Sequence, residues 1–204
     1  PRPGRRCSRP GHTAAVLPAG WPIFEVPPRP PPSPAPRRLQ QSSGKGSDKA
    51  SALQAAVNEW VANPTNASQT YGPIADWNVG AVTDGDELFK DKTTFNEAIG
   101  GWDTSRMTSM HRMFYGASSF DQPLSFDTSR VKTMNEMFKF ATSFNQTVAF
   151  NTSGVTQMDW MFHKASSFNQ PGISAWDVSK VTKMGRTFFN AVAFNSELRV
   201  GHEL

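Results

Sequence analysis

Aromatic residues recur along most of this chain at a nearly constant interval. The first column is Trp77, Trp102, Phe126, Phe150 and Trp176, the second is Phe89, Phe114, Phe138, Phe162 and Phe188, and the third is Phe95, Phe120, Phe144, Phe168 and Phe194. In every column the successive spacings are 25, 24, 24 and 26 residues. The sequence therefore contains five copies of one unit, of which the first and the last are the least regular.

Each unit predicts two short extended segments and one short helical segment. An apolar residue shortly before the first aromatic, such as Ile99 before Trp102, indicates a short strand. An Asp-Thr-Ser turn follows, because Asx and Ser side chains bond their own backbone two residues on. The motif Val-Thr-x-Met then predicts a second strand, and Met-x-x-Met-Phe-x-x-Ala predicts one or two helical turns.

A single unit is too short to bury its own aromatic and methionine side chains. We therefore predict that the units stack side by side as a repeat solenoid of short parallel strands and short helical turns. The side chains expected in its continuous core are Trp102, Phe126, Phe150, Trp176, Phe114, Phe138, Phe162, Phe120, Phe144, Phe168, Met110, Met134 and Met158.

A polar residue follows the third aromatic of every unit. These residues are Asn96, Asp121, Asn145, Asn169 and Asn195. We expect them to form a ladder in which each side chain satisfies backbone groups at a tight corner, Asp121 acting only as an acceptor.

An amphipathic helix is predicted before the repeats, from Lys49 to Ala62. Leu53, Val57 and Trp60 fall on one face of it, and Pro64 is expected to end it. At this position the helix should cover the open end of the stack. The predicted organisation is a disordered Pro- and Arg-rich tail at 1–47, a capping helix and lead-in at 48–73, the five-repeat solenoid at 74–198 and a C-terminal tail at 199–204.

The basic character of the chain lies in its N-terminal segment. The net charge is +4 over 204 residues, but residues 1–49 carry +7 and the remainder carries −3. Residues 1–49 also hold twelve of the sixteen prolines. Net charge therefore gives no reason to expect nucleic-acid binding by the repeats. The Pro-rich run at 27–36 is interpreted as an extended linker, and recruitment of a proline-binding module is the alternative.

Cysteine content and hydropathy exclude several classes. The single cysteine, Cys7, rules out a disulfide framework and cysteine-based metal sites. No apolar run is long enough to span a membrane, and no signal peptide is visible. Because the sequence begins with Pro rather than Met, it is interpreted as a processed or an incomplete product, and the missing signal peptide therefore does not decide the compartment.

No set of residues predicts catalysis. There are four histidines, His12, His111, His163 and His202, and the two within the repeats, His111 and His163, occupy different repeat positions and should not converge. Asp103, Asp127 and Asp177 align in one column, where turn capping is expected and Ca²⁺ binding is the alternative. We therefore predict no catalytic residue, no metal ligand and no cofactor. Asn66 and Asn151 are candidate glycosylation sites in turns, whereas the sequon at Asn145 lies in the ladder.

The repeats resemble those of the BspA-like leucine-rich-repeat surface proteins, in the branch described as a Mycoplasma-type domain of unknown function. The motif W-D-T-S-x-V-T-x-M-x-x-M-F-x-x-A-x-S-F-N-Q is nearly complete at 102–122, 126–146 and 150–170 and is degraded in the outer units, where Gly85 and Thr187 replace methionines. The resemblance covers roughly residues 50–198. It implies a leucine-rich-repeat-like fold and an extracellular or cell-surface binding function.

These observations together predict a non-catalytic protein- or glycan-binding or adhesion module, located outside the cell or at its surface. Binding is expected to use exposed Ser, Thr, Asn and Lys side chains of the turns rather than the aromatic columns. An intracellular scaffold acting through the proline-rich segment is the alternative, and an enzyme is a third hypothesis. End-to-end self-association through the last repeat is also expected, because nothing after Leu198 predicts a cap.

Overall fold

The computed structural model describes residues 46–196, and the side chains of residues 51–196. The expected tails at 1–47 and 199–204 lie almost entirely outside these residues. The described elements are α1 (Gly46–Ala62), α2 (Pro64–Tyr71) and the 3₁₀ helices η2 (Ile74–Asp76) and η3 (Pro171–Ala175). All other described residues form turns, bends, isolated bridges and irregular chain.

Two helices precede the repeats, where one was expected. α1 covers the helix predicted at Lys49–Ala62, and α2 begins only two residues later. Pro64 ends the first helix, but it also suits the first turn of the second because its missing N–H is not needed there. The side chain of Asn63 caps α2 by accepting from the backbone N–H of Asn66 at 3.1 Å.

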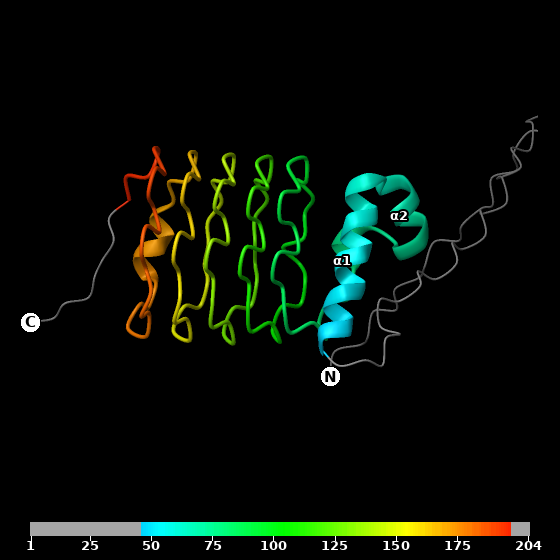
Figure 1. Cartoon of the computed structure of the whole chain (residues 1–204), viewed down its shortest axis with the longest axis horizontal. Helices are drawn as coiled ribbons and strands as arrows, with labels where there is room; N and C mark the ends of the chain where they lie inside the picture. The colour runs from blue at the N-terminus through cyan, green and yellow to red at the C-terminus, as the bar shows by residue number, and fades with distance from the viewer. Residues whose placement is uncertain (1–45, 197–204) are drawn as a thin grey trace, which may run out of the picture. The chain divides into compact units, whose positions relative to one another are not determined.

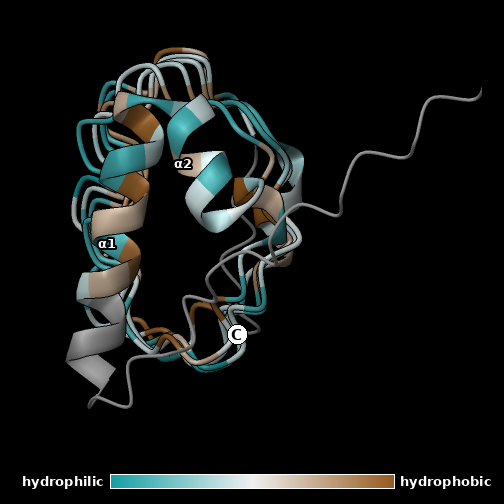
Figure 2. Cartoon of the chain, turned by 90° about the vertical axis from the view of Figure 1, so that its right-hand side faces the viewer, coloured by the Kyte–Doolittle hydropathy of each residue, from teal (hydrophilic) through white to brown (hydrophobic). Residues whose placement is uncertain are grey.

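The five units lie side by side, and α1 packs against the first of them (Figure 1). Seen along the stack, their backbones nearly superimpose, with α1 and α2 across one end (Figure 2). Leu53, Ala56, Val57 and Trp60 of α1 are buried in the same apolar cluster as the repeats. Trp60 meets Trp77 edge to face, with ring centroids 5.8 Å apart. The helix therefore extends the core and covers its first layer.

The predicted strand-based solenoid is wrong. Residues 46–196 contain no β-strand, and the only β-type pairing between neighbouring units is a row of isolated parallel bridges: Asp84–Ser109, Ser109–Thr133, Thr133–Gln157 and Gln157–Lys183. The first expected strand position is instead a 3₁₀ helix in two units, η2 and η3. The Met-x-x-Met-Phe segment, expected to be helical, forms hydrogen-bonded turns.

Left-handed backbone explains why neither strand nor helix forms. Every unit contains two residues of positive φ, four positions apart, as at Glu136 (56°) and Phe140 (63°). A left-handed residue interrupts both the extended and the right-handed helical conformation. Hydrogen bonds consequently alternate: Arg112 N–H donates to the Asn135 carbonyl of the next unit at 3.0 Å, and Tyr115 N–H donates back to the Arg112 carbonyl at 3.0 Å.

The core consists of phenylalanine rings stacked in register. In the second aromatic column, neighbouring centroids are 5.2 to 5.5 Å apart with interplanar angles of 2° to 6°. Each ring also stacks on the third-column ring of its own unit, for example Phe138 on Phe144 at 4.1 Å. The resulting zigzag buries Phe114, Phe138, Phe144 and Phe162 completely. Ring stacking adds roughly 0.5–1.5 kcal/mol per pair to burial itself.

A column of buried threonines joins neighbouring units by hydrogen bonds, except in the fourth unit. The Thr104 and Thr128 hydroxyls donate to the Asp127 and Asn151 carbonyls of the following units at 3.1 and 3.0 Å. Thr152 is equally buried, at 2% exposure, but its hydroxyl has no hydrogen-bond partner in the described part of the chain. The fifth unit follows the fourth at a spacing of 26 residues rather than 24. The carbonyl of Asp177, which is equivalent to those of Asp127 and Asn151, therefore does not reach the hydroxyl of Thr152.

This difference predicts opposite effects of one substitution at two sites. Thr152→Val keeps the shape and removes an unpaired buried hydroxyl, so the free energy of unfolding should stay unchanged or rise by about 1 kcal/mol. Thr128→Val removes a made hydrogen bond and should lower it by about 1 kcal/mol. Urea unfolding followed by tryptophan fluorescence measures both. A larger loss at Thr152 than at Thr128 would contradict the assignment.

Candidate binding surface

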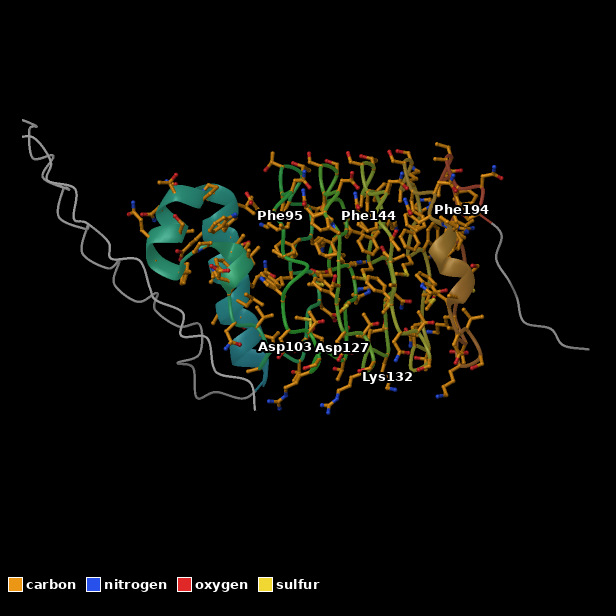
Figure 3. All side chains as sticks on the ribbon, turned by 180° about the vertical axis from the view of Figure 1, so that it is seen from behind. Phe95, Asp103, Asp127, Lys132, Phe144 and Phe194 are labelled. Carbon is orange, nitrogen blue, oxygen red and sulfur yellow. The ribbon has the colours of Figure 1, made fainter. Side chains whose placement is uncertain are left out.

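The aromatic and methionine columns predicted for the core are buried and present no ligand surface. From Met110 to Phe168 the predicted core residues are at most 6% exposed, and Trp102 and Trp176 are 3% and 8% exposed. Figure 3 shows Phe95, Phe144 and Phe194 in one row, with Asp103, Asp127 and Lys132 at the opposite edge of the stack. A ligand must therefore contact other positions.

The polar column forms a continuous ladder. Each side chain accepts from the backbone N–H of the equivalent residue in the next unit: Asn96 from Asp121 and Asp121 from Asn145 at 2.9 Å, Asn145 from Asn169 at 2.9 Å, and Asn169 from Asn195 at 3.0 Å. All four side chains act as acceptors, so Asp121 fits the ladder as well as asparagine does. The side chains are thereby committed to the fold.

The aspartate column caps turns. Asp103, Asp127, Asn151 and Asp177 accept from the backbone N–H two residues on, at 2.9 to 3.2 Å. Hydrogen bonds from Ser105, Ser129 and Ser179 hold the pKa of the three aspartates below the usual value. Residues 46–196 contain no group of three or more His, Cys, Asp or Glu arranged to hold a metal ion.

The two candidate glycosylation sites are exposed but differ in backbone structure. Asn151 lies at a turn, and its side-chain oxygen accepts from both the N–H and the hydroxyl of Ser153. Asn66 lies within α2 rather than in the expected turn. Asn145 is also exposed, although its side-chain oxygen accepts from Asn169 and Gln170. Use of these sites remains a prediction.

His111 and His163 lie in different columns, and each makes its own backbone contact. Nδ1 of His111 is 3.1 Å from the Asn135 carbonyl, and Nδ1 of His163 donates to the Phe189 carbonyl at 2.8 Å. Both carbonyls belong to the following unit, so both imidazoles join neighbouring repeats. His163 is only 5% exposed and lies within the surface described next.

The two left-handed columns define an unexpected surface. One contains Glu87, Arg112, Glu136, Trp160 and Arg186, and the other contains Asp91, Gly116, Phe140, Lys164 and Asn190. Only one of these ten positions is glycine. Left-handed backbone costs a residue with a Cβ roughly 1–2 kcal/mol, and a bulky residue there is an outlier. Such outliers gather at functional sites, so large side chains on these columns mark a candidate site.

Aromatic and cationic side chains interleave on this surface from the second to the fifth unit. We call it the aromatic–cationic face, made of Arg112, Tyr115, Lys139, Phe140, Trp160, His163, Lys164, Arg186 and Phe189. Its rings meet mostly edge to face, at 5.4 Å for Tyr115 and Phe140 and 4.7 Å for Trp160 and His163. The ring of Phe189 is 51% exposed.

The rings hold the cations in place. Lys139 Nζ and the Arg186 guanidinium both lie 4.7 Å from the Trp160 ring centroid, and Lys164 Nζ lies 5.3 Å from that of Phe140. Each contact contributes about 0.5–1 kcal/mol at an exposed site. The charged groups are thus fixed against apolar platforms instead of moving freely in solvent.

Ion pairing divides the face into two parts. Glu87 and Glu136 bind Arg112 at 3.4 and 3.0 Å, and Glu136 also binds Lys139 at 3.0 Å. Although burial raises the pKa of Glu136, its cationic partners outweigh burial and lower it overall. Lys164 and Arg186 make no ion pair within residues 46–196. Within the described residues, no ion pair therefore neutralises the two cations that the last two units contribute to this face.

Sequence reasoning missed this face because its residue types change from unit to unit. Position five after the first Met column holds Tyr115, Lys139, His163 and Phe189 in turn. A search for repeated residues finds the core and overlooks such a column. The signal that could have found this face lies in the positions that vary between units. Aromatic and basic residues are concentrated at the variable positions that flank the Met-Phe pair.

The last described unit exposes two apolar side chains. Met184 is 38% exposed, whereas its counterparts Met110, Met134 and Met158 are fully buried because a following unit covers each of them. Val192 is 81% exposed, at a position where the earlier units have serine or threonine. End-to-end self-association through this unit stays a prediction.

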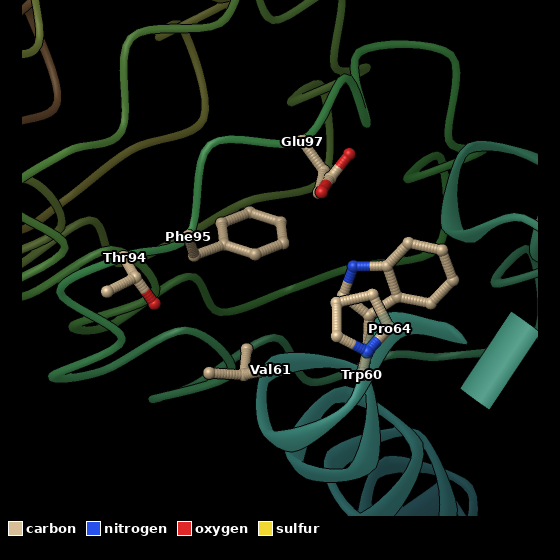
Figure 4. Close-up of a pocket in the computed structure, with 6 residues that line it drawn as sticks. All are labelled: Trp60, Val61, Pro64, Thr94, Phe95 and Glu97. Atoms are coloured by element: carbon tan, nitrogen blue, oxygen red, sulfur yellow. The ribbon is translucent and has the colours of Figure 1, made fainter. Parts of the chain in front are cut away.

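A small cavity lies where the end of α1 meets the first unit (Figure 4). It is lined by Trp60, Val61, Pro64, Thr94, Phe95 and Glu97. Its volume is about 60 Å³, comparable to two water molecules. The indole N–H of Trp60 has no acceptor in the described structure. Because this nitrogen is buried, a ligand in the cavity does not reach it. The cavity is too small for an ordinary organic ligand.

Stacked units with a continuous aromatic core define the molecule as a repeat protein. The chain belongs to the family described as Mycoplasma protein of unknown function, DUF285, whose model matches residues 57–149 and 124–200. This match confirms the motif resemblance at the level of that family. No curated protein and no solved structure matches the chain. Within residues 46–196, no helix has the length and apolarity needed to cross a bilayer.

Truncation of Phe140 should change the free energy of unfolding far less than truncation of Phe144. Phe140→Gly relieves left-handed strain and removes a half-buried ring, so the free energy of unfolding should change by less than about 1 kcal/mol. Phe144→Ala empties a fully buried position and should lower the free energy of unfolding by about 3–5 kcal/mol. Chemical unfolding of both variants tests this contrast. Equal losses would show that Phe140 is a core residue.

His163 should make stability depend on pH. Burial, followed by nearby Lys139, Lys164 and Arg186, lowers the pKa of His163 below 6.5 despite the Phe189 hydrogen bond. The unfolded chain therefore binds this proton more readily, so the stabilisation is complete above pH 6.5 and declines as pH falls below it. His163→Asn should flatten thermal stability between pH 5 and 7. An unchanged slope would refute the contribution of this residue.

Proposed function

We propose that this chain is a non-catalytic module that binds glycan outside the cell or at its surface, with the aromatic–cationic face as the contact surface. One observation carries the proposal: large aromatic and cationic side chains occupy backbone positions where glycine or asparagine is less strained. Asn190 and Gly116 show that the same columns accept those residues. Packing alone gives no reason to keep tryptophan there.

The chemistry of the face suits a sugar ligand. Tryptophan, tyrosine and phenylalanine present apolar surface to the C–H groups of a sugar ring, and lysine and arginine donate hydrogen bonds to its oxygens. The face follows the stack across four units, so an extended chain can contact equivalent positions in succession. This differs from the contact expected at the turns, where several polar side chains are committed to capping and to the ladder.

Two further observations support an extracellular location and a binding role. Exposed sequon asparagines occur at Asn66 and Asn151. The repeat motif also resembles that of the BspA-like surface proteins, and we propose that the chain is related to them. A protein ligand is the second candidate, because tyrosine, tryptophan and arginine are also enriched at protein interfaces.

A glycan array and a panel of intact cells, probed with the fluorescently labelled full chain, test the proposal. Trp160→Gly should weaken glycan binding about tenfold or more, because it removes a half-buried aromatic ring at the centre of the face. Chemical unfolding should show that the variant stays folded. Asp91→Gly is the matched control, since it changes a left-handed residue of similar φ in the first unit that makes no ion pair with the face, and it should leave binding unchanged.

The outcomes separate the candidates. Binding to glycans that Trp160→Gly abolishes and Asp91→Gly preserves supports the proposal. Binding to cells that survives removal of their glycans but not of their surface proteins favours a protein ligand. Glycan binding that is insensitive to Trp160→Gly would place the contact surface elsewhere on the molecule.

A further inference from the structure

We infer that the ligand is a linear anionic polysaccharide, which lies along the stack over the fourth and fifth units and pairs its anions with Lys164 and Arg186. This inference rests on the proposed function, because it specifies the ligand of the same face. Three features of the face lead to it: the cations that lie against its rings, the carboxylate partners of these cations and the distance between rings of adjacent units.

The ring surfaces of this region are already occupied by cations. Lys139 and Arg186 both lie over Trp160, and Arg186 also lies 5.7 Å from the centroid of Phe189. Lys139 and Lys164 lie 5.5 and 5.3 Å from the centroid of Phe140. A ligand that approaches here meets positive charge before it meets the rings. The rings consequently act as supports that orient cations, so the first requirement on the ligand is negative charge.

The charge balance locates the anions within the face. Arg112 and Lys139 share the carboxylates of Glu87 and Glu136, and both lysine and glutamate of the Lys139–Glu136 pair are mostly buried. Lys164 and Arg186 have no carboxylate partner within the described residues. Asp159, the acid that precedes Trp160, accepts from the Gly185 N–H at 2.8 Å and forms no ion pair with either cation within the described residues. The strongest attraction for an anion is therefore over the fourth and fifth units.

The spacing of the units favours a carbohydrate. Equivalent rings of adjacent units are 5.2 to 5.5 Å apart in the buried column, and His163 and Phe189 on the face are also 5.5 Å apart. One pyranose residue of an extended polysaccharide has nearly this length.

Fixed cations also lower the cost of binding. A free lysine loses rotamer entropy when it pairs with a ligand, whereas one already held over a ring loses less. Because exposed charges are screened by salt, the interaction should weaken as ionic strength rises.

The test compares one polymer in two charge states. Polygalacturonate carries one carboxylate per sugar, and its fully methyl-esterified form has the same backbone without charge. The full chain should bind polygalacturonate, should bind the ester at least about tenfold more weakly, and should lose affinity as NaCl is raised. Isothermal titration calorimetry or a biosensor measures each affinity.

Charge-removing variants locate the contact. Lys164→Gln combined with Arg186→Gln should weaken polygalacturonate binding about tenfold or more, because each lost charge-assisted hydrogen bond contributes to affinity. Lys132→Gln is the matched control: Lys132 is exposed, is not a residue of the aromatic–cationic face, and lies at the same edge of the stack as Asp103 and Asp127 (Figure 3). It should bind as the unmodified chain does. Chemical unfolding should show all variants folded.

Each alternative result has a distinct meaning. Equal binding of both polymer forms, lost in Trp160→Gly, would overturn the anionic ligand and leave glycan binding intact. Tighter binding of single-stranded poly(U) or polyglutamate through the same two cations would overturn the carbohydrate assignment and the proposed function with it. Failure to bind either polymer form, or equal weakening by Lys132→Gln, would overturn the inference directly.

Discussion

The structure depends on backbone hydrogen bonds that alternate between neighbouring units and the same unit. This alternation needs two left-handed residues in each repeat, which turn every second N–H toward the next unit. The same geometry places equivalent residues of successive units in register, so the phenylalanine rings stack face to face. It also removes the regular extended backbone on which a β-strand depends. One constraint thus explains the stacking, the core and the absence of strands from residues 46–196.

The left-handed positions also connect the fold to the candidate binding surface. Backbone energetics alone would favour glycine or asparagine there, as at Gly116 and Asn190. Gly116 has an additional reason, because a Cβ would come within 2.5 Å of the Asp91 carboxylate. Phe140 and Trp160 have no comparable structural reason, and their rings support cations instead. The fold tolerates this strain because the hydrogen bonds on both sides of the corner over-determine its conformation.

The two ends of the stack are treated differently. α1 closes the first unit with a buried apolar face and with a side-chain hydrogen bond from Gln54 to the Leu88 carbonyl at 3.0 Å. The fifth described unit leaves Met184 and Val192 exposed. Interior units gain contacts on both sides, so the middle of the stack should be its most stable part. The uncompensated cations Lys164 and Arg186 lie toward the less covered end.

Several features of this protein follow from the sequence alone, because they depend on which side chains recur and at what interval. The period, the burial of the aromatic and methionine columns, the helix before the repeats and the acceptor role of Asp121 all belong to this group. α2 could also have been found, since Asn63 followed by Pro64 is a helix-start pattern. The backbone conformation that links the buried positions could not have been found from the sequence. Periodicity cannot distinguish a strand from a left-handed turn when both bury the same residues, and residues such as Trp160 and Phe140 rarely adopt positive φ. Only contacts between residues 24 to 26 positions apart determine that conformation, and with it which variable side chains meet on one face.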